Sequence, residues 1–136
     1  MTKVLVVDDS RFDRSLIRKA LQFPGEQVEI LELSSGEKAA DTIETEHPCM
    51  TVLDIRMPRM DGFKVLTAIR GRETLKDHKV VMLSGSDRKV DRELADAIGA
   101  NGYFVKPSSA KAYRDLAADL HSRYLPCSSA FGANTD

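Results

Sequence analysis

The sequence predicts an α/β protein with a doubly wound parallel sheet of five strands. Short apolar runs bounded by turn residues alternate along the chain with longer segments whose apolar residues recur at helical spacing. This alternation is typical of strands that pair in parallel through right-handed helical crossovers. The length of 136 residues allows one domain with a single hydrophobic core.

Five short segments have the β-branched or apolar composition of strands. Segment 50–53 is the clearest, because this uncharged run stops on the carboxylate of Asp54 and predicts a strand buried on both faces. The expected strands are 3–7, 27–33, 50–53, 79–83 and 102–105.

Helices are expected between these strands. Ser10 and Asp13 have the spacing of a capping box, and so do Ser34 and Glu37. Asp61 is placed to act as an N-cap rather than as a metal ligand. The expected helices are 11–23, one through 39–43, one through 63–69, 90–98 and 109–124. The apolar stripe of the fourth helix consists of Val90, Leu94, Ala97 and Ile98.

The strand order places polar residues from distant parts of the chain in one pocket. Five strands favour the flavodoxin-like order 2-1-3-4-5, in which the first and third strands are neighbours at the switch point. Asp8 and Asp9 follow the first strand, and Asp54 follows the third. Ser84 from the fourth strand and Lys106 from the fifth flank them. We therefore expect these five side chains to converge where open α/β sheets bind their ligands.

The chemistry of this pocket favours phosphoryl transfer. Three carboxylates forced together repel one another unless a cation lies among them. Ligands that offer only oxygen select a hard divalent ion, and Mg²⁺ fits best because it also reaches phosphate oxygens. A carboxylate nucleophile, Mg²⁺ and the ammonium of Lys106 are the groups that phosphoryl transfer requires.

The composition argues against several other classes of protein. The 20 basic and 21 acidic residues give no electrostatic reason to bind nucleic acid or an anionic membrane. No apolar stretch approaches the roughly 18–20 residues of a membrane span, and no signal peptide is expected. Cys49 and Cys127 lack metal or redox spacing, which favours a reduced cytoplasmic protein. His47, His78 and His121 share no ligand spacing and are expected on the surface.

Four motifs resemble those of a two-component response regulator receiver domain of the CheY-like type. They are Val-Val-Asp-Asp, Leu-Asp-Ile-Arg-Met-Pro-Arg-Met-Asp-Gly, Leu-Ser-Gly-Ser and Gly-Tyr-Phe-Val-Lys-Pro. The resemblance implies a receiver domain over residues 1–125, followed by a flexible tail at 126–136. Segments 99–103 and 122–125 also resemble stand-alone receivers that work with phytochrome-type histidine kinases.

The resemblance also implies a metal site and a phosphorylation site. Asp54 corresponds to the phosphoacceptor. Asp9 corresponds to a direct Mg²⁺ ligand, together with Asp54 and the backbone carbonyl of Arg56, while Asp8 acts largely through water. Arg56 and Ser86 occupy positions that line the path of the attacking water, so they are expected to influence the lifetime of the phosphoryl group.

A switch mechanism is implied in the same way. Ser84 corresponds to the switch hydroxyl, Lys106 to the ammonium that pairs with the phosphoryl group, and Tyr103 to the switch aromatic. Their rearrangement is expected to change the surface of the fourth helix, fifth strand and fifth helix, and so control binding of a downstream protein or self-association. The resemblance implies that the phosphodonor partner is a sensor histidine kinase. The protein is expected to be no enzyme beyond its own phosphorylation and dephosphorylation.

Other functions remain open at this stage. The chain could act as an intermediate receiver in a phosphorelay, or be a fragment of a longer regulator. A Mg²⁺-dependent aspartyl phosphohydrolase, as in haloacid-dehalogenase-like enzymes, needs an acid two residues after the nucleophile, where this chain has Arg56. A receiver-shaped interaction module that works without phosphate is expected to lack an acidic or lysine position, and none is missing here.

Overall fold

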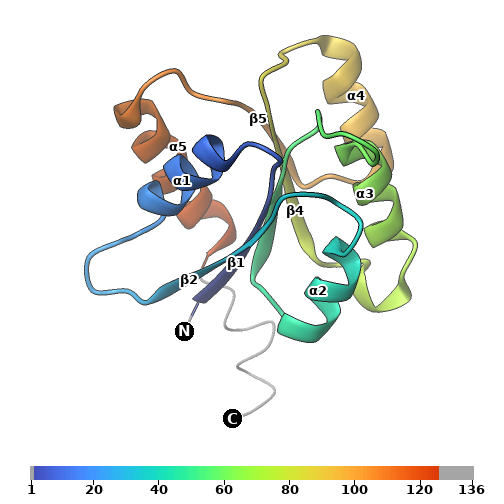
Figure 1. Cartoon of the computed structure of the whole chain (residues 1–136), viewed down its shortest axis with the longest axis horizontal. Helices are drawn as coiled ribbons and strands as arrows, with labels where there is room; N and C mark the ends of the chain where they lie inside the picture. The colour runs from blue at the N-terminus through green and yellow to red at the C-terminus, as the bar shows by residue number, and fades with distance from the viewer. Residues whose placement is uncertain (1, 126–136) are drawn as a thin grey trace.

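A central sheet of five parallel strands has the order β2-β1-β3-β4-β5, as the sequence predicts. Figure 1 shows the computed structural model, which describes residues 2–125. The tail expected at 126–136 lies outside these residues. The strands are β1 (Thr2–Val7), β2 (Val28–Leu33), β3 (Met50–Leu53), β4 (Lys79–Ser84) and β5 (Gly102–Val105).

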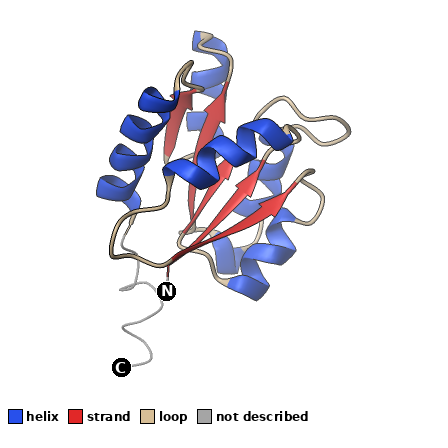
Figure 2. Cartoon of the chain, turned by 60° about the vertical axis from the view of Figure 1, so that its left-hand side comes forward, coloured by secondary structure: helices blue, strands red, loops and turns tan. Residues whose placement is uncertain are grey.

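The helices form a layer on each face of the sheet, α1 and α5 on one face and α2, α3 and α4 on the other (Figures 1 and 2). None of those between residues 2 and 125 is both long and apolar enough to cross a membrane. They are α1 (Arg11–Ala20), α2 (Ala39–Glu46), α3 (Gly62–Arg70), α4 (Lys89–Ile98) and α5 (Ala110–Tyr124), with a short 3₁₀ helix, η1 (Glu73–Leu75).

The register of the strands aligns the residues that follow them. Val7 of β1 is the partner of Leu53 of β3, so Asp8 and Asp54 come next at the same level of the sheet. The backbone pairing continues past the strands, because the Asp54 amide donates to the Val7 carbonyl at 2.9 Å. The Lys106 amide likewise donates to the Ser84 carbonyl at 2.7 Å, at the ends of β5 and β4.

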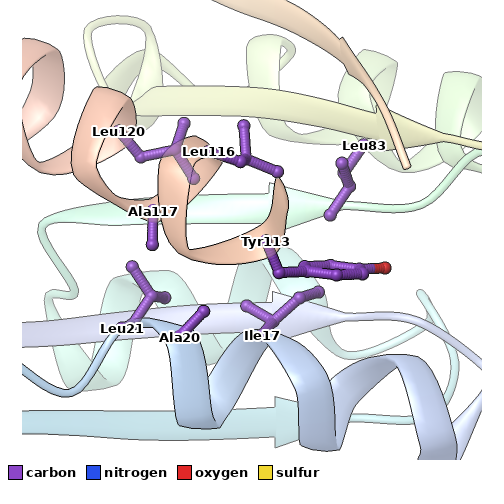
Figure 3. A pocket seen from close by; sticks show the side chains of 8 residues that line it. All are labelled: Ile17, Ala20, Leu21, Leu83, Tyr113, Leu116, Ala117 and Leu120. Atoms are coloured by element: carbon purple, nitrogen blue, oxygen red, sulfur yellow. The ribbon is translucent and has the colours of Figure 1, made fainter. Parts of the chain in front are cut away.

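Alternating side chains of the strands fill two hydrophobic layers. Val4 and Val6 of β1 face α1 and α5, whereas Leu5 and Val7 face α2, α3 and α4. Side chains of α1 and α5 meet directly in the first layer and leave a cavity of only about 10 Å³, which is too small for a ligand (Figure 3). The residues that line it are Ile17, Ala20, Leu21, Leu83, Tyr113, Leu116, Ala117 and Leu120.

The starts and ends of two helices differ from the sequence prediction. Helix α1 ends at Ala20, three residues earlier than expected. The expected capping box of Ser34 and Glu37 is wrong, since α2 begins after Lys38 and has no side-chain cap. Gly36 explains the later start: a Cβ there would lie 2.1 Å from a methyl group of Val65 in α3, so the segment crosses α3 closely as a loop.

The inner face of α4 is not its most apolar one. Val90 and Leu94, whose spacing predicts the helix, are exposed, whereas Ile98 is partly buried against the core. Asp91 and Ala95 are the buried residues of this helix. Asp91 can be buried because its carboxylate accepts hydrogen bonds from the Ser86 hydroxyl and the Arg56 guanidinium.

Two smaller predictions are also corrected. His78 is not a surface histidine: it is half-buried, and its Nε2 lies 2.8 Å from the Thr51 hydroxyl. Burial, and then the nearby Arg70 charge, lower the pKa of His78 to about 4.

Cys49 is partly buried against the first layer but is disulfide-bonded rather than a reduced thiol. Disulfides are rare in a reducing cytosol, so the cysteines give no support to a cytoplasmic location.

Candidate functional site

Three carboxylates meet at the carboxyl ends of β1 and β3. One oxygen from each of Asp8, Asp9 and Asp54 lies within 4.8 Å of the others. Asp8 and Asp54 are buried, whereas Asp9 is exposed to solvent. A set of ligands that contains only oxygen, open on one side, suits a hard divalent cation that keeps some of its water. The convergence of these residues follows from the strand order and register described above.

The loop after β3 folds back tightly over Asp54. The Gly62 amide donates to the Ile55 carbonyl at 2.8 Å, which brings the start of α3 against the end of the strand. A Cβ at Gly62 would lie 2.3 Å from the Asp54 carbonyl oxygen, so only glycine fits this approach. Asp61 caps α3 by accepting a hydrogen bond from the Lys64 amide, as the sequence predicts. Met57 is buried in the core beneath this loop.

Lys106 supplies the positive charge of the site. Its Nζ lies 2.9 Å from Asp8 Oδ2 and 3.4 Å from Asp54 Oδ1. A third carboxylate, that of Asp13, is the nearest at 2.7 Å. This contact is not predicted from the sequence, where the spacing of Ser10 and Asp13 indicates only a helix cap. The position of Asp13 in the first turn after Asp9 was the available signal.

The electrostatics of the site keep Asp54 close to its titration range. Burial and the negative charge of Asp8 raise the pKa of Asp54 to about 6, although Lys106 partly opposes them. Burial alone would lower the pKa of Lys106, but hydrogen bonds to Asp13 and Asp8 outweigh it and raise the pKa above its ordinary value. Near pH 7 the site therefore contains an ionised Asp54 beside a firmly charged ammonium.

Ser84 lies at the end of β4, fully buried. Its hydroxyl oxygen accepts a hydrogen bond from the Ser86 amide at 3.1 Å. The Tyr103 hydroxyl donates to the carbonyl of the same Ser86 at 2.7 Å. The guanidinium of Arg92 stacks over the Tyr103 ring at 4.8 Å. The loop between β4 and α4 thus connects the two residues that the sequence analysis named as switch residues.

Arg56 and Ser86 share one buried carboxylate. The Ser86 hydroxyl donates to Asp91 Oδ2 at 2.7 Å, and the Arg56 guanidinium contacts the same oxygen at 3.3 Å. Asp91 is 6% exposed, whereas the Arg56 side chain is largely in solvent. Asp91 was not singled out from the sequence, and an acidic residue beside an apolar stripe was its only signal. These contacts hold the β3–α3 loop against the start of α4.

The comparisons with known proteins give the family. The family model of the response regulator receiver domain matches residues 4–118. The chain is 37% identical to the response regulator MprA of Mycobacterium tuberculosis over 105 residues, which cover 77% of this chain and 44% of MprA. It is 34% identical to the alkaline phosphatase synthesis transcriptional regulatory protein PhoP of Bacillus subtilis over 107 residues, or 79% of this chain and 43% of PhoP.

Solved structures show the same fold over nearly their whole length. The Mn²⁺-bound response regulator Rcp1 has a TM-score of 0.81 at 26% identity, covering 93% of this chain and 96% of Rcp1. The phosphorylated cyanobacterial phytochrome response regulator RcpA has a TM-score of 0.84 at 26% identity, and the match covers 92% of this chain and 94% of RcpA. CheY4 of Vibrio cholerae has a TM-score of 0.78 at 30% identity, and the match covers 92% of this chain and 99% of CheY4.

The fold and the matched sequence define a signalling domain rather than a classical enzyme. This chain belongs to the response regulator receiver domain family of two-component systems. Receiver domains interact with histidine kinases and downstream targets, and they generally bind Mg²⁺ at an acidic pocket. The chain spans less than half the length of the curated relatives it matches.

Proposed function

We propose that this chain is a phosphoacceptor signalling switch in which Asp54 takes a phosphoryl group from a sensor histidine kinase. The observation that carries the proposal is the buried Asp54 carboxylate, grouped with Asp8 and Asp9 and placed 3.4 Å from the Lys106 ammonium. Membership of the receiver family supports the same reaction.

The chemistry assigns one role to each group. An ionised Asp54 oxygen attacks the phosphorus of the phosphohistidine, the P–N bond breaks, and the imidazole leaves with its electron pair and takes a proton from solvent. With a pKa of about 6, Asp54 is deprotonated at neutral pH and able to attack. Lys106 offsets the negative charge that the phosphoryl oxygens bring into the site.

The donor set fits Mg²⁺, because the three grouped carboxylates offer oxygen only. Asp9, Asp54 and the backbone carbonyl of Arg56 would hold the ion, and Asp8 would act through a bound water. When bound, Mg²⁺ supplies positive charge that brings the carboxylate and the phosphoryl oxygens together.

We assign the switch to Ser84 and Tyr103. After phosphorylation the Ser84 hydroxyl leaves the Ser86 amide and donates to a phosphoryl oxygen, while Lys106 pairs with another. Tyr103 then gives up its bond to the Ser86 carbonyl and turns inward. Changing the ratio of active to inactive conformations from 1:99 to 99:1 requires about 5.5 kcal/mol of additional stabilisation of the active conformation. Two charge-assisted hydrogen bonds of about 1.5–3 kcal/mol each come close to that value.

The α4-β5-α5 surface is the proposed output surface. Val90 and Leu94, the exposed large apolar residues of α4, lie on the helix that follows the Ser84 loop. A downstream protein or a second copy of the chain would bind there in a phosphate-dependent way. An intermediate role in a phosphorelay is the alternative. We place either role in the cytoplasm on the strength of the histidine kinase partner alone, since the disulfide of Cys49 does not support that location.

Incubation with acetyl phosphate and Mg²⁺ tests the proposal. We expect a stable acyl phosphate on Asp54, detected by intact-mass spectrometry and mapped by peptide analysis. Asp54→Asn should abolish the label, because an amide is a poor nucleophile. Asp77→Asn, at an exposed aspartate, is the matched control and should label like the parent. Label that persists in Asp54→Asn would refute the assignment, and steady release of phosphate from a phosphomonoester would indicate a phosphohydrolase instead.

A further inference from the structure

The Lys106 ammonium makes its shortest contact with a carboxylate outside the group of three. Its Nζ is 2.7 Å from Asp13 Oδ2, but 3.4 Å from the Asp54 oxygen that is to carry the phosphoryl group. Neither side chain is freely solvated, since Lys106 is 18% and Asp13 24% exposed. Asp13 neither accepts the phosphoryl group nor belongs to the three carboxylates that are grouped for a metal ion.

The start of α1 brings Asp13 to Lys106. The Ser10 hydroxyl accepts a hydrogen bond from the Asp13 amide at 3.1 Å and caps the helix. In a full capping box the Asp13 carboxylate would accept from the Ser10 amide, but that amide donates to Asp8 Oδ1 at 2.8 Å. The Asp13 carboxylate therefore takes no part in the cap and is available to the ammonium.

The first turn of α1 is also tied in place by Arg14. Its Nη1 donates to the Asp8 carbonyl at 2.6 Å, and its Nε contacts Glu32 of β2 at 2.9 Å. These bonds attach the helix to both β1 and β2 beside the site. The backbone of Asp13 is therefore held beside the site, and an exchange of partners by Lys106 requires side-chain movement rather than movement of the helix.

We propose that Asp13 is a positioning residue that holds the Lys106 ammonium on the α1 side of the site and competes for it with phosphorylated Asp54. This inference rests on the proposed function. An ammonium has three N–H donors, and a phosphoryl group adds negative charge at Asp54. Lys106 must then move toward Asp54, and the charge of Asp13 opposes that movement. Asp13 thereby limits how strongly the phosphorylated state is stabilised.

Asp13→Asn tests the charge without changing the shape of the side chain. We expect beryllofluoride, a phosphoryl mimic, to bind about three- to tenfold more tightly in saturating Mg²⁺, because a neutral acceptor competes less well than a carboxylate. Isothermal titration calorimetry measures this affinity. Asp13→Glu restores the charge and should return the affinity toward that of the parent. Asp115→Asn removes a charge from an exposed ion pair with Lys111 and should leave the affinity unchanged.

A double-mutant cycle shows whether Asp13 acts through Lys106. In a Lys106→Met background the ammonium is absent, so Asp13→Asn should no longer tighten beryllofluoride binding. The inference is overturned if Asp13→Asn fails to tighten binding in the parent. It is equally overturned if the gain is the same in both backgrounds, which would indicate a general effect of charge.

Magnesium titration separates this inference from the proposed function. A parent protein that neither takes label on Asp54 nor binds beryllofluoride would refute the proposed function. The role of Asp13 in positioning Lys106 is then tested by Mg²⁺ affinity alone, which is measured by NMR titration of the unphosphorylated protein. The released ammonium moves toward Asp8 and Asp54, so Asp13→Asn should weaken Mg²⁺ binding, and less so with Lys106→Met. Equal Mg²⁺ affinity in Asp13→Asn and parent would overturn the role of Asp13.

Discussion

Asp54 illustrates, at the scale of one residue, how a reactive group weakens the fold. Its pKa of about 6 in the folded protein lies above the ordinary value of 3.8, so the folded state favours the protonated form. The contribution of this group to stability is therefore complete below about pH 4 and is lost as the pH rises through 6. At neutral pH the ionised carboxylate destabilises the fold when no metal is bound.

We predict that Asp54→Asn stabilises the metal-free protein at pH 7.5, by about 1–3 kcal/mol in the free energy of unfolding. Urea denaturation followed by circular dichroism in the presence of a chelator measures the difference. At pH 4, where the parent carboxyl is protonated, the gain should largely disappear. A gain of equal size at both pH values would mean that the ionisation of Asp54 is not its cause.

His78 gives a pH dependence of the opposite sign. Its folded-state pKa of about 4 lies below the ordinary 6.5, so the folded protein favours the neutral ring that meets Thr51. The stability that comes from this preference is present above pH 6.5 and is lost as the pH falls toward 4. The half-buried position between the sheet and Arg70 is the physical cause.

Replacement of His78 by Gln should remove this part of the acid sensitivity. Between pH 7.5 and 5, we expect the parent to lose about 1–2 kcal/mol more unfolding free energy than His78→Gln. Urea titrations at both pH values measure it. His121→Gln changes a histidine that pairs with Glu26 near the surface, and it should retain the loss that is due to His78. Identical pH profiles for His78→Gln and parent would contradict the prediction.

At the scale of elements, the loop from β4 to α4 connects the reaction site to the output surface. Ser84 precedes the loop, Ser86 lies within it, and Asp91 anchors the first turn of α4 through the Ser86 hydroxyl. Tyr103 of β5 is bonded to the same loop. A change at Ser84 therefore reaches α4 and β5 through a single backbone segment.

We predict that Ser84→Ala uncouples this response more than it slows phosphorylation. Without the hydroxyl, residue 84 cannot donate a hydrogen bond to a phosphoryl oxygen, so α4 and Tyr103 should remain in their unphosphorylated positions. Amide chemical shifts of α4 and β5, compared with and without beryllofluoride, report the response. Ser108→Ala, at an exposed serine, is the control. Equal beryllofluoride-induced shifts in Ser84→Ala and parent would exclude this route.

The orientation of α4 and the start of α2 show why sequence patterns fail at this scale. The spacing of apolar residues predicts the buried face of a helix only where that face contacts apolar groups. In α4 the buried face carries Asp91, because Ser86 and Arg56 form hydrogen bonds with its carboxylate. Helix α2 starts late because Gly36 approaches Val65 of α3 closely. Both effects depend on contacts with residues distant along the chain.

For the whole molecule, the strand order and the grouping of Asp8, Asp9, Asp54 and Lys106 could be predicted from the sequence. Strand composition and connection rules determine the order, and the order determines which strand ends meet. The contact between Asp13 and Lys106 could not be predicted in this way. It depends on a side chain in the first turn of α1 reaching the end of β5, and on Ser10 donating to Asp8 instead of to Asp13.

The pairing of Val7 with Leu53 makes the two ends of the sheet unequal in their tolerance of insertions. One extra residue within β1 or β3 would turn every later side chain of that strand to the opposite face, so Asp8 and Asp54 would no longer point into one pocket. At the opposite end, the largely exposed connection 22–27 returns the chain to the sheet and can vary in length. The strands therefore tolerate few insertions before their carboxyl ends, where the site lies, and more in the connections that lead into their amino ends.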